Sequence, residues 1–416
     1  MGEAWIIDSC RTPRGIGKVG KGALASFHPQ VLGATVLAAI AERNHLDTAD
    51  VDDVVFGTSM QVGVQGGDLG RMAALDAGYA TTASGVTLDR FCGSGITAAS
   101  LAAASIMAGL EDVVVAGGAE MMSLHPSLME GSRRSPFMDN GNLRLRARHP
   151  QTHQGVAADA IATLEGIPRR ALDELAVESQ RRAAVAVEEG RFERSLVPVL
   201  HEDGTVALDR EEYPRPGTTI ATLASLPPSF EALADVPLDD EGNTFRQQVL
   251  RRYPDLEIDH VHHAGNSSGV VDGAAAILFT SPDYARAHGM EPRARVVATA
   301  NVGDDPTLML NAPGPSARKV LSRAGLTLDD IDVFEVNEAF AAVTEKFIRD
   351  LDIDREKINP NGGAIALGHP IGATGAMLIG TALDELERID GRYGLITMCA
   401  GGGMAPAIVI ERVDTT

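Results

Sequence analysis

Cys92 has the neighbours that a nucleophilic cysteine needs. It is one of three cysteines in 416 residues and stands in the segment FCGSG. Gly93 and Gly95 permit a tight turn, and the Ala-rich run that follows predicts a helix beginning next to Cys92. The partial positive charge and free N–H groups of a helix N-terminus favour a thiolate, so the segment predicts a strand–nucleophile–helix junction. Without partners, however, a cysteine is more often a small buried apolar residue.

Three further segments, all in the C-terminal part of the chain, offer a base and donors for an oxyanion. His369 lies on the glycine-rich loop of NPNGGAIALGHPIGATG, just before a predicted helix. Cys399 ends a predicted strand and precedes three glycines in CAGGGMA, whose N–H groups can point at negative charge. Asn337 and Glu338 end another strand in EVNEAFA, at the edge where open α/β sheets hold their sites. Together these segments predict one site between two parts of the chain.

The elements that must position these residues occur twice. HLDTADVDDVVFGTSMQ (45–61) is echoed by GLTLDDIDVFEVNEAFA (325–341), and VVVAGGAEMM (113–122) by LITMCAGGGM (395–404). The two pairs are separated by nearly the same distance in the sequence, which indicates a duplication. We therefore predict two similar βαβ-rich halves, one covering 1–122 and 267–291 and the other covering 292–416.

Between the halves, residues 123–266 are rich in Arg, Pro and acidic residues and lack strand alternation. The stretch RRALDELAVESQRRAAVAVEEG predicts a helix with one buried face, made of Leu172, Leu175, Ala176, Ser179 and Ala183. We predict an inserted loop domain that contributes ligand contacts, with residues 231–260 as an extra excursion inside it.

The run from Phe91 to Leu110 holds twenty residues without a charge, enough to span a bilayer. It consists mostly of Ala, Ser and Gly and has few of the Leu, Ile and Phe residues that drive membrane insertion. An acidic pair and a compact predicted strand follow it. We predict a helix covered by protein on all sides, and no membrane insertion.

The charge balance excludes some classes of partner. A formal net charge of −21 repels nucleic acids and acidic lipid surfaces, although a local basic patch can still hold a small anionic ligand. Cys10, Cys92 and Cys399 are too few and too scattered for a disulfide framework, which indicates a reducing compartment. The N-terminus lacks the pattern of a secretory signal, and the C-terminus has no peroxisomal or retention motif. We expect a cytoplasmic protein.

Two other motifs favour ordinary loops. GIGKVG at 15–20 matches the dinucleotide-binding pattern G-x-G-x-x-G, but no helix pattern opens where a pyrophosphate would need one. His260, His262 and His263 in HVHH invite a metal interpretation, yet no carboxylate or Cys stands at ligand spacing beside them. We predict neither a dinucleotide site nor a metal site.

The chain resembles the thiolases over essentially its whole length. The resemblance rests on RTPRG, FCGSG, VVVAGGAEMMS, HAGNSSGVVDGAA, VNEAFA, NPNGGAIALGHPIGATG and CAGGGMAPA, of which the last three are highly specific. It implies the α/β thiolase fold: two βαβαβαββ halves in a five-layered α-β-α-β-α sandwich, with a loop domain grafted on the first half. The implied activity is cleavage of 3-ketoacyl-CoA with CoA, or Claisen condensation of two acyl-CoAs, through an S-acyl-cysteine intermediate. Acyl-CoA and CoA are then substrates and products, and no cofactor is bound permanently.

The resemblance also implies a role for each residue of the predicted site. Cys92 would accept the acyl group, and His369 would activate it. Cys399 would be the second acid/base, moving the proton of the acetyl-CoA methyl group or of the CoA thiol. Asn337 would position a water that, with His369, stabilises the enolate oxygen. The N–H groups of Cys92 and Gly401 would form a second oxyanion pocket.

Positions for CoA follow from the same resemblance. They are Ser268 and Ala264 at the pantetheine wall, Arg215, Thr222 and Phe230 around the adenine and phosphates, Ala339 and Phe340 at the tunnel mouth, and His153 in the family's His-Met-Gly segment. Three features depart from the family pattern: Gln154 replaces the usual Met, His263 replaces the usual Thr, and residues 231–260 interrupt the segment. These departures leave the acyl-chain preference and the CoA contacts open.

One segment indicates how the chain assembles. QGGDLGRMAALDAG (65–78) resembles the family's dimer contact, so we expect a homodimer or a homotetramer built as a dimer of dimers. The alternatives are a decarboxylating β-ketoacyl synthase, a non-catalytic CoA- or lipid-binding protein of the same fold, and a cysteine hydrolase. A synthase or a hydrolase would not need Cys399, and a silent protein should have lost one of the four site residues.

Overall fold

A large mixed β-sheet organises the computed structural model, which describes residues 2–129 and 137–413. Among these residues its strands run in the order β10-β11-β12-β9-β1-β8-β5-β3-β4, with β2 paired to β8. Their bounds are β1 Trp5–Arg11, β2 Gly15–Ile16, β3 Asp53–Gly57, β4 Val86–Leu88, β5 Val113–Met121, β8 Val271–Thr280, β9 Ala294–Gly303, β10 Val333–Val336, β11 Tyr393–Thr397 and β12 Met404–Arg412.

The sheet consists of two portions joined by a narrow seam. β1 and β9 pair only at Trp5 with Arg295 and at Ile6 with Ala294. On one side β3 runs parallel to β5, which pairs antiparallel with β8; on the other β10 runs parallel to β11, which pairs antiparallel with β12. The two portions therefore repeat one pattern, as the duplicated sequence predicts.

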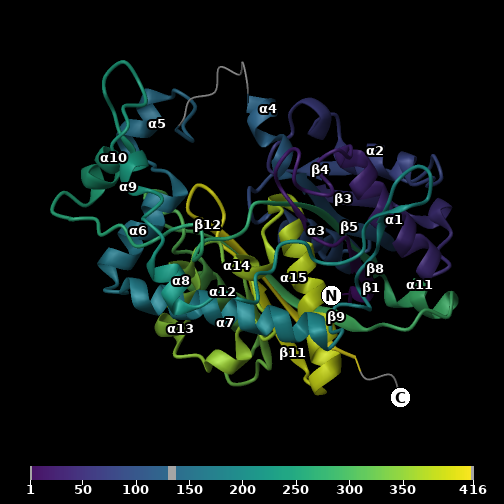
Figure 1. Ribbon diagram of the computed structural model, residues 1–416. Helices are drawn as coiled ribbons and strands as arrows, with labels where there is room; N and C mark the ends of the chain where they lie inside the picture. The colour runs from purple at the N-terminus through teal and green to yellow at the C-terminus, as the bar shows by residue number, and fades with distance from the viewer. Residues whose placement is uncertain (1, 130–136, 414–416) are drawn as a thin grey trace.

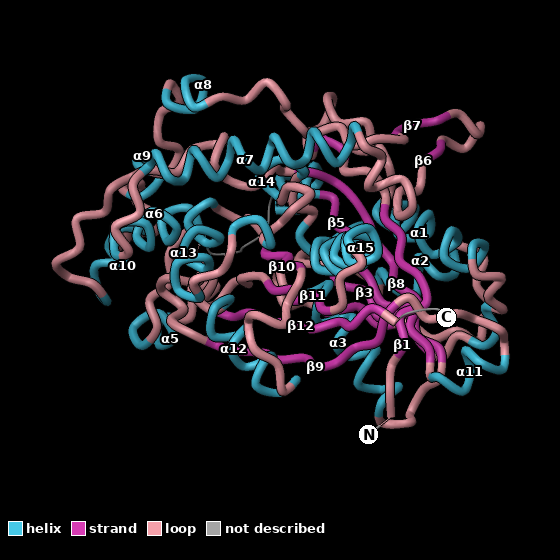
Figure 2. Tube along the Cα trace, turned by 90° about the horizontal axis from the view of Figure 1, so that it is seen from below, coloured by secondary structure: helices cyan, strands magenta, loops and turns pink. Residues whose placement is uncertain are grey.

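Helices form three layers around the two portions of the sheet. The middle layer holds α3 (Ser94–Met107) and α15 (Ile371–Ile389), and Figure 2 looks nearly along α15 with strands around it. One outer layer holds α1 (Pro29–Arg43) and α2 (Leu69–Asp76), packed on the portion with β3, β5 and β8. The other holds α12 (Pro313–Ala324) and α13 (Ala341–Leu351), packed on β9, β10, β11 and β12. The predicted α-β-α-β-α sandwich is confirmed.

The charge-free run forms α3, in the centre of this sandwich. Ile96, Ala99 and Ala102 are fully buried against α15 and the strands. The two helices touch backbone to backbone, because a Cβ added to Gly95 would lie 2.7 Å from the backbone nitrogen of Ala376. Within the described residues no helix is long and apolar enough to cross a membrane. The first turns of the run are covered by protein, but the prediction of cover on all sides is wrong further along, where Leu101 is 52% and Leu110 79% exposed.

The segment between the halves is mainly helical, and most of its helices form a lobe at the left of Figure 1. Its elements are α4 His125–Met129, α5 Leu143–Arg148, α6 Gln154–Leu164, α7 Arg169–Glu188, β6 Val199–Leu200, β7 Val206–Leu208, α8 Ile220–Ala224, α9 Glu231–Ala234 and α10 Phe245–Arg252. The helix predicted by its buried face is α7, in which Leu172, Ala176, Ser179 and Ala183 are buried, whereas Leu175 of the predicted face is only half-buried. The expectation of a segment without strands is wrong in one place, because β6 and β7 pair as a small hairpin too short to show alternation.

Two local predictions can also be compared with the structure. The GIGKVG segment forms β2 and a turn, and the next helix, α1, begins only at Pro29, so the loop interpretation is confirmed. The excursion at 231–260 packs on the lobe through Phe245, whose ring meets Phe137 edge-on at 5.5 Å. The remaining helices are α11 (Pro282–Ala287), after β8, and α14 (Ala364–Leu367), just before the loop that carries His369.

Candidate active site

A cavity of about 270 Å³ lies where the two halves and the lobe meet. Its lining includes five of the predicted site residues: Cys92, Cys399, Gly401, Ala339 and His153. The remaining lining residues are Ser59, Phe91, Met138, Thr152, Gln154, Met309, Leu310, Ile371 and Ala400. Two cysteines that are more than three hundred residues apart in the sequence therefore face one space.

A tight turn presents Cys92 at the start of α3. Phe91, just before it, has a φ of 51°, in the left-handed region that side chains rarely adopt. The Phe91 N–H donates to Asp89 Oδ1 (2.6 Å), and the Ser94 hydroxyl accepts from Arg90 N (2.8 Å) and donates to the Phe91 carbonyl (2.7 Å). With Gly93 as the N-cap, these bonds hold Cys92 one residue before the cap, as the predicted junction requires.

The protonation state of Cys92 differs from the sequence-based expectation. Burial, followed by the charge of Glu120, raises the pKa of the Cys92 thiol to about 12, against a smaller lowering by a backbone hydrogen bond. Burial, followed by the proximity of Cys92, also raises the pKa of Cys399 above its ordinary value. The prediction that the helix N-terminus makes Cys92 a thiolate is therefore wrong for the free protein, because desolvation outweighs the helix dipole. Both cysteines are thiols that need a base.

His369 is held in the tautomer that a base requires. Its Nδ1 lies 2.6 Å from the Thr374 hydroxyl, which donates its own proton to the Pro370 carbonyl (3.1 Å). The Thr374 oxygen must therefore accept from Nδ1–H, which leaves Nε2 without a proton. Burial, opposed by Glu120 and assisted by Arg14, lowers the pKa of His369 to about 4. At neutral pH the imidazole is uncharged and able to accept a proton at Nε2.

Asn337 lies beside the unprotonated Nε2 of His369. It follows β10 and is fully buried, and its Nδ2 lies 3.4 Å from His369 Nε2. Its Oδ1 has no hydrogen-bond partner within the part of the chain that the structure describes. A buried amide oxygen without a partner is costly, so this atom suits a bond to a bound donor such as water.

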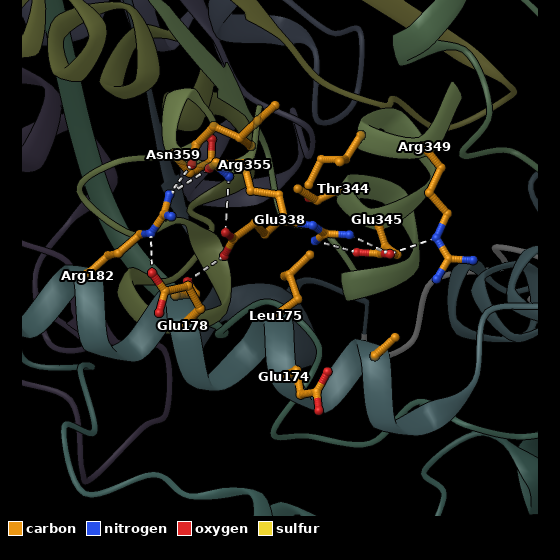
Figure 3. A pocket seen from close by; sticks show the side chains of 14 residues that line it. Glu174, Leu175, Glu178, Arg182, Glu338, Thr344, Glu345, Arg349, Arg355 and Asn359 are labelled. Atoms are coloured by element: carbon orange, nitrogen blue, oxygen red, sulfur yellow. Dashed lines mark hydrogen bonds and ion pairs between the residues drawn. The ribbon is translucent and has the colours of Figure 1, made fainter. Parts of the chain in front are cut away.

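Glu338 fixes the turn that carries Asn337. It lines a second, polar cavity of about 440 Å³ between α7 and α13, shown in Figure 3. Its carboxylate accepts from the Ser179 hydroxyl (2.7 Å), Asn359 Nδ2 (3.0 Å) and Ile365 N (3.2 Å). These bonds connect the Asn337 turn to α7 and to the segment leading to His369, which sets the two loops relative to each other.

The predicted CoA positions fall into two neighbouring groups. Arg215, Thr222 and Ala264 line a cavity of about 240 Å³. Phe230 is absent from that lining, although the resemblance grouped it with Arg215 and Thr222. Instead it belongs to an aromatic cluster, with its ring 5.6 Å from that of His153 and 5.8 Å from that of Phe340.

Ser268 joins the CoA group to the Asn337 turn. Its backbone N–H donates to the Ala339 carbonyl at 3.0 Å, two residues after Asn337. Ala339 in turn lines the cavity that holds both cysteines. The structure therefore places the half-buried Ser268 directly beside the turn that carries Asn337.

The histidines of HVHH bind carboxylates. His260 and His262 each place Nδ1 2.7 Å from Asp159, and His263 Nε2 lies 2.8 Å from Asp173. In the described ranges no group of three or more His, Cys, Asp or Glu side chains is arranged to hold a metal. The three histidines therefore anchor the lobe to the loop before Ser268.

Sequence reasoning missed two side chains that act on the site from behind. Thr374 sets the tautomer of His369, and Glu120 alters the charge balance of both Cys92 and His369. Each had a weak signal in the sequence: a hydroxyl five residues after the histidine, and a lone acid at the end of an apolar strand. Neither signal shows by itself which loop it meets.

Comparison with known proteins gives a consistent result. The descriptions "Thiolase, N-terminal domain" and "Thiolase, C-terminal domain" match residues 4–236 and 290–412. Among curated relatives, an acetyl-CoA acetyltransferase of Escherichia coli is 39% identical over 425 residues, which is 100% of both chains. A beta-ketoadipyl-CoA thiolase of Acinetobacter baylyi is 38% identical over 99% of this chain and 100% of its own.

Similarity extends to a solved structure. The crystal structure of the Bacillus anthracis acetyl-CoA acetyltransferase superposes with a TM-score of 0.83 and 32% identity, covering 99% of each chain. The predicted thiolase fold is thereby confirmed. Since both family domains and full-length relatives cover the molecule, and since the paired thiols and the histidine are what acyl transfer between CoA thioesters needs, this chain belongs to the thiolase family of acyltransferases.

Proposed function

We propose that this chain cleaves 3-ketoacyl-CoA with CoA, and runs the reverse condensation, with Cys92 carrying the acyl group. The observation that carries this proposal is that Cys92 and Cys399 line one cavity while His369 keeps Nε2 unprotonated. A hydrolase would need only Cys92 and His369, and a decarboxylating synthase would not need Cys399. A second thiol facing the first supports carbon–carbon bond chemistry, in which a proton must be moved at carbon.

In the first half-reaction, Cys92 Sγ attacks the 3-keto carbon as His369 Nε2 takes the thiol proton. The resulting oxyanion points at the N–H groups of Cys92 and Gly401. Breaking the C2–C3 bond leaves the acyl group on Cys92 and releases the enolate of acetyl-CoA. The enolate oxygen meets His369 and a water held by Asn337, and the Cys399 thiol protonates its carbon.

In the second half-reaction, the Cys399 thiolate takes the proton of the incoming CoA thiol. The CoA sulfur then attacks the acyl group, and the Cys92 thiolate that leaves regains its proton from His369. All three groups return to their starting protonation states. Because both thiols begin protonated, each transfer occurs in step with bond making, which suits a buried site.

The walls of the cavity support an apolar acyl group as substrate. Five large apolar side chains line it: Phe91, Met138, Met309, Leu310 and Ile371. A second carboxylate on the acyl chain would lose its hydration against them, whereas an alkyl chain would gain contact. We therefore propose 3-ketoacyl-CoAs with unsubstituted chains, and not dicarboxylic ones such as 3-oxoadipyl-CoA.

One experiment tests both parts. The intact protein is mixed with CoA and 3-ketoacyl-CoAs of graded chain length, with 3-oxoadipyl-CoA as the charged arm, and cleavage is followed by loss of the ketoacyl-CoA enolate absorbance. Mass spectrometry of peptides after mixing with acetyl-CoA then locates the adduct. We expect cleavage of alkyl substrates and an acetyl group on Cys92. An adduct on Cys399, or no cleavage at any length, would refute the assignment, and faster cleavage of the charged arm would refute the substrate class.

Replacing Thr374 with valine should lower kcat roughly 100-fold, with little change in KM. The variant keeps the volume but removes the acceptor of His369 Nδ1–H, so the proton moves to Nε2 and the base is lost. Thr381→Val is the matched control, since Thr381 lies on the same helix, is buried and makes the same backward bond, to the Met377 carbonyl. Equal kcat values for the two variants in steady-state thiolysis would exclude the tautomer role.

We also propose a homo-oligomer that uses the edge strand β4. This strand ends the sheet, leaving backbone groups without a neighbouring strand, and its Val86 is 43% exposed. It lies beside α2, within the segment 65–78, through a bond from Gly70 N to the Thr87 hydroxyl. A Val86→Lys variant should lower the molar mass by light scattering to that of one chain, whereas Leu110→Lys, at an exposed site elsewhere, should not. Unchanged mass in Val86→Lys would place the contact elsewhere.

Two further assignments remain proposals. We place the domains at 1–122 with 267–291, at 123–266 and at 292–416, supported by the position of β8 between β1 and β5. A cytoplasmic location is supported by the three cysteines, all of which are free.

A further inference from the structure

Glu120 lies where the two halves of the sandwich meet. It is next to last in β5 and shares the strand face of Val114 and Ala116, which pack against the middle helices. Its side chain is fully buried. Buried carboxylates are costly unless bonded on all sides, so its surroundings show what it serves.

Each oxygen of Glu120 accepts two hydrogen bonds. Oε2 accepts from Ser59 N (2.7 Å) and Gly372 N (3.0 Å), and Oε1 from Gln65 Nε2 (3.0 Å) and His125 Nε2 (2.9 Å). Gly372 is the second residue of α15, three residues after His369, and it belongs to the other half. Ser59 lines the cavity that holds Cys92. Oε2 of Glu120 therefore links the loop that carries His369 to the cavity wall beside Cys92.

At this junction α15 and β3 are in direct backbone contact. A Cβ added to Gly372 would lie 2.5 Å from the Gly57 carbonyl oxygen, so α15 abuts the end of β3 directly. The orientation of Gln65 is also fixed, because its Oε1 accepts from Met121 N at 2.7 Å and its Nε2 must therefore face Glu120. Glu120 consequently has one geometry, and it sets the start of α15.

Glu120 is an anion whose field reaches both reacting groups. Burial acts to raise its pKa, but the hydrogen bond and charge of His125 and the bonds from Ser59 and Gln65 hold that pKa below its ordinary value. After burial, its charge is the largest influence on the pKa of Cys92 and of His369, and it raises both. The other titratable or charged groups that act on these residues are Asp89 and Cys399 around Cys92, Arg14 around His369, and His125 around Glu120.

We propose that Glu120 is a positioning residue that fixes the His369 loop against the half carrying Cys92, and that its charge is the counter-ion of the imidazolium formed during acylation. The inference rests on the proposed roles of Cys92 and His369. The proton moves from Cys92 Sγ to His369 Nε2, and the carboxylate itself transfers nothing. The charge of Glu120 makes the Cys92 thiol less acidic in the free enzyme, and it stabilises the His369 imidazolium while the acyl group is on Cys92.

Two substitutions of Glu120 separate the effect of its charge from the effect of its side-chain length. In Glu120→Gln the charge is lost, so alkylation of Cys92 by iodoacetamide, quantified by peptide mass spectrometry between pH 7 and 9.5, should become roughly tenfold faster, since a neighbouring anion typically shifts a pKa by about one unit. Turnover should fall at least about tenfold, because the imidazolium loses its counter-ion. A loosened fold would also expose Cys92 and speed its alkylation, so alkylation of Cys10, a second free and buried thiol, is followed in the same digests and should stay at the parental rate.

Two variants serve as comparison. Glu120→Asp keeps the charge but shortens the reach to Gly372, so alkylation should stay within about twofold of the parent while turnover falls. Glu385→Gln removes a different buried carboxylate, which lies on α15 about 20 Å along the helix from Gly372, and should leave the alkylation rate of Cys92 unchanged. Unchanged or slower alkylation in Glu120→Gln overturns the proposal, and if that variant does not fold, full turnover in Glu120→Asp does so. Failure of the parent protein to acetylate Cys92 would refute the proposed function instead, and the alkylation readout does not depend on it.

Discussion

Replacing Cys92 with alanine is expected to lower the rate of 3-ketoacyl-CoA thiolysis by at least about 10⁴-fold. We propose that this thiol accepts the acyl chain, and the cavity around it offers only one other thiol, Cys399. Cys399 is 1% exposed and lies behind a different turn, so it cannot replace a nucleophile at the start of α3. The measurement is steady-state thiolysis, together with the mass of the protein after mixing with acetyl-CoA.

Cys10→Ala is the matched control for this experiment. Cys10 is also a free thiol, more deeply buried than Cys92, and its S–H donates to the Val36 carbonyl in the outer core beside α1. Its loss should cost some stability and leave thiolysis close to that of the parent protein. An acetyl adduct that persists in Cys92→Ala, or turnover reduced equally in both variants, would contradict the assignment of the nucleophile.

Replacing Cys399 with alanine is expected to divide the reaction into its two kinds of chemistry. Carbon–carbon bond cleavage and formation should fall roughly 10³-fold, because no other thiol lining the cavity can protonate the enolate carbon or remove a proton from it. Acetylation of Cys92 by acetyl-CoA should persist, since a thiolate is a good leaving group and water can protonate it. Peptide mass spectrometry therefore should find the adduct in a protein that no longer condenses.

Proton exchange gives an independent readout of the same role. With the parent protein, the methyl protons of acetyl-CoA should exchange in D2O, as followed by NMR, because Cys399 removes and returns them. With Cys399→Ala this exchange should stop while acetylation of Cys92 continues. Exchange at the parental rate would move the acid/base role to His369, which is the other proton acceptor held near the site.

Much of the site was predictable because its signals are local. Glycines beside Cys92 and after Cys399 announce tight turns, and these residues do lie at the ends of elements that meet at one cavity. The buried face of α7 and the central position of α3 follow from residue spacing and from the absence of charge. The β6–β7 hairpin was missed because strands of two and three residues carry too few positions to show a period.

Residues placed by resemblance alone were harder to locate. Arg215, Thr222 and Ala264 do share a cavity, but Phe230 packs with His153 and Phe340 instead. Aromatic contacts of this kind depend on how α6, the loop before α9 and the start of α13 converge. No spacing within a single segment encodes that convergence.

The sequence by itself predicted a candidate set of reacting residues and the strands and helices that carry them, and its repeated segments indicated two similar halves. Only the tertiary structure decided their protonation states. Cys92 is a thiol, His369 is a neutral imidazole whose Nε2 carries no proton, and Glu120 is an anion whose charge acts on both residues. The physical reason is that a pKa depends on desolvation and on charges brought close in space. Here those contributions come from α3 and β5, which are neighbours in the sequence, and from α15, which follows more than two hundred residues later and meets them only in the folded sandwich.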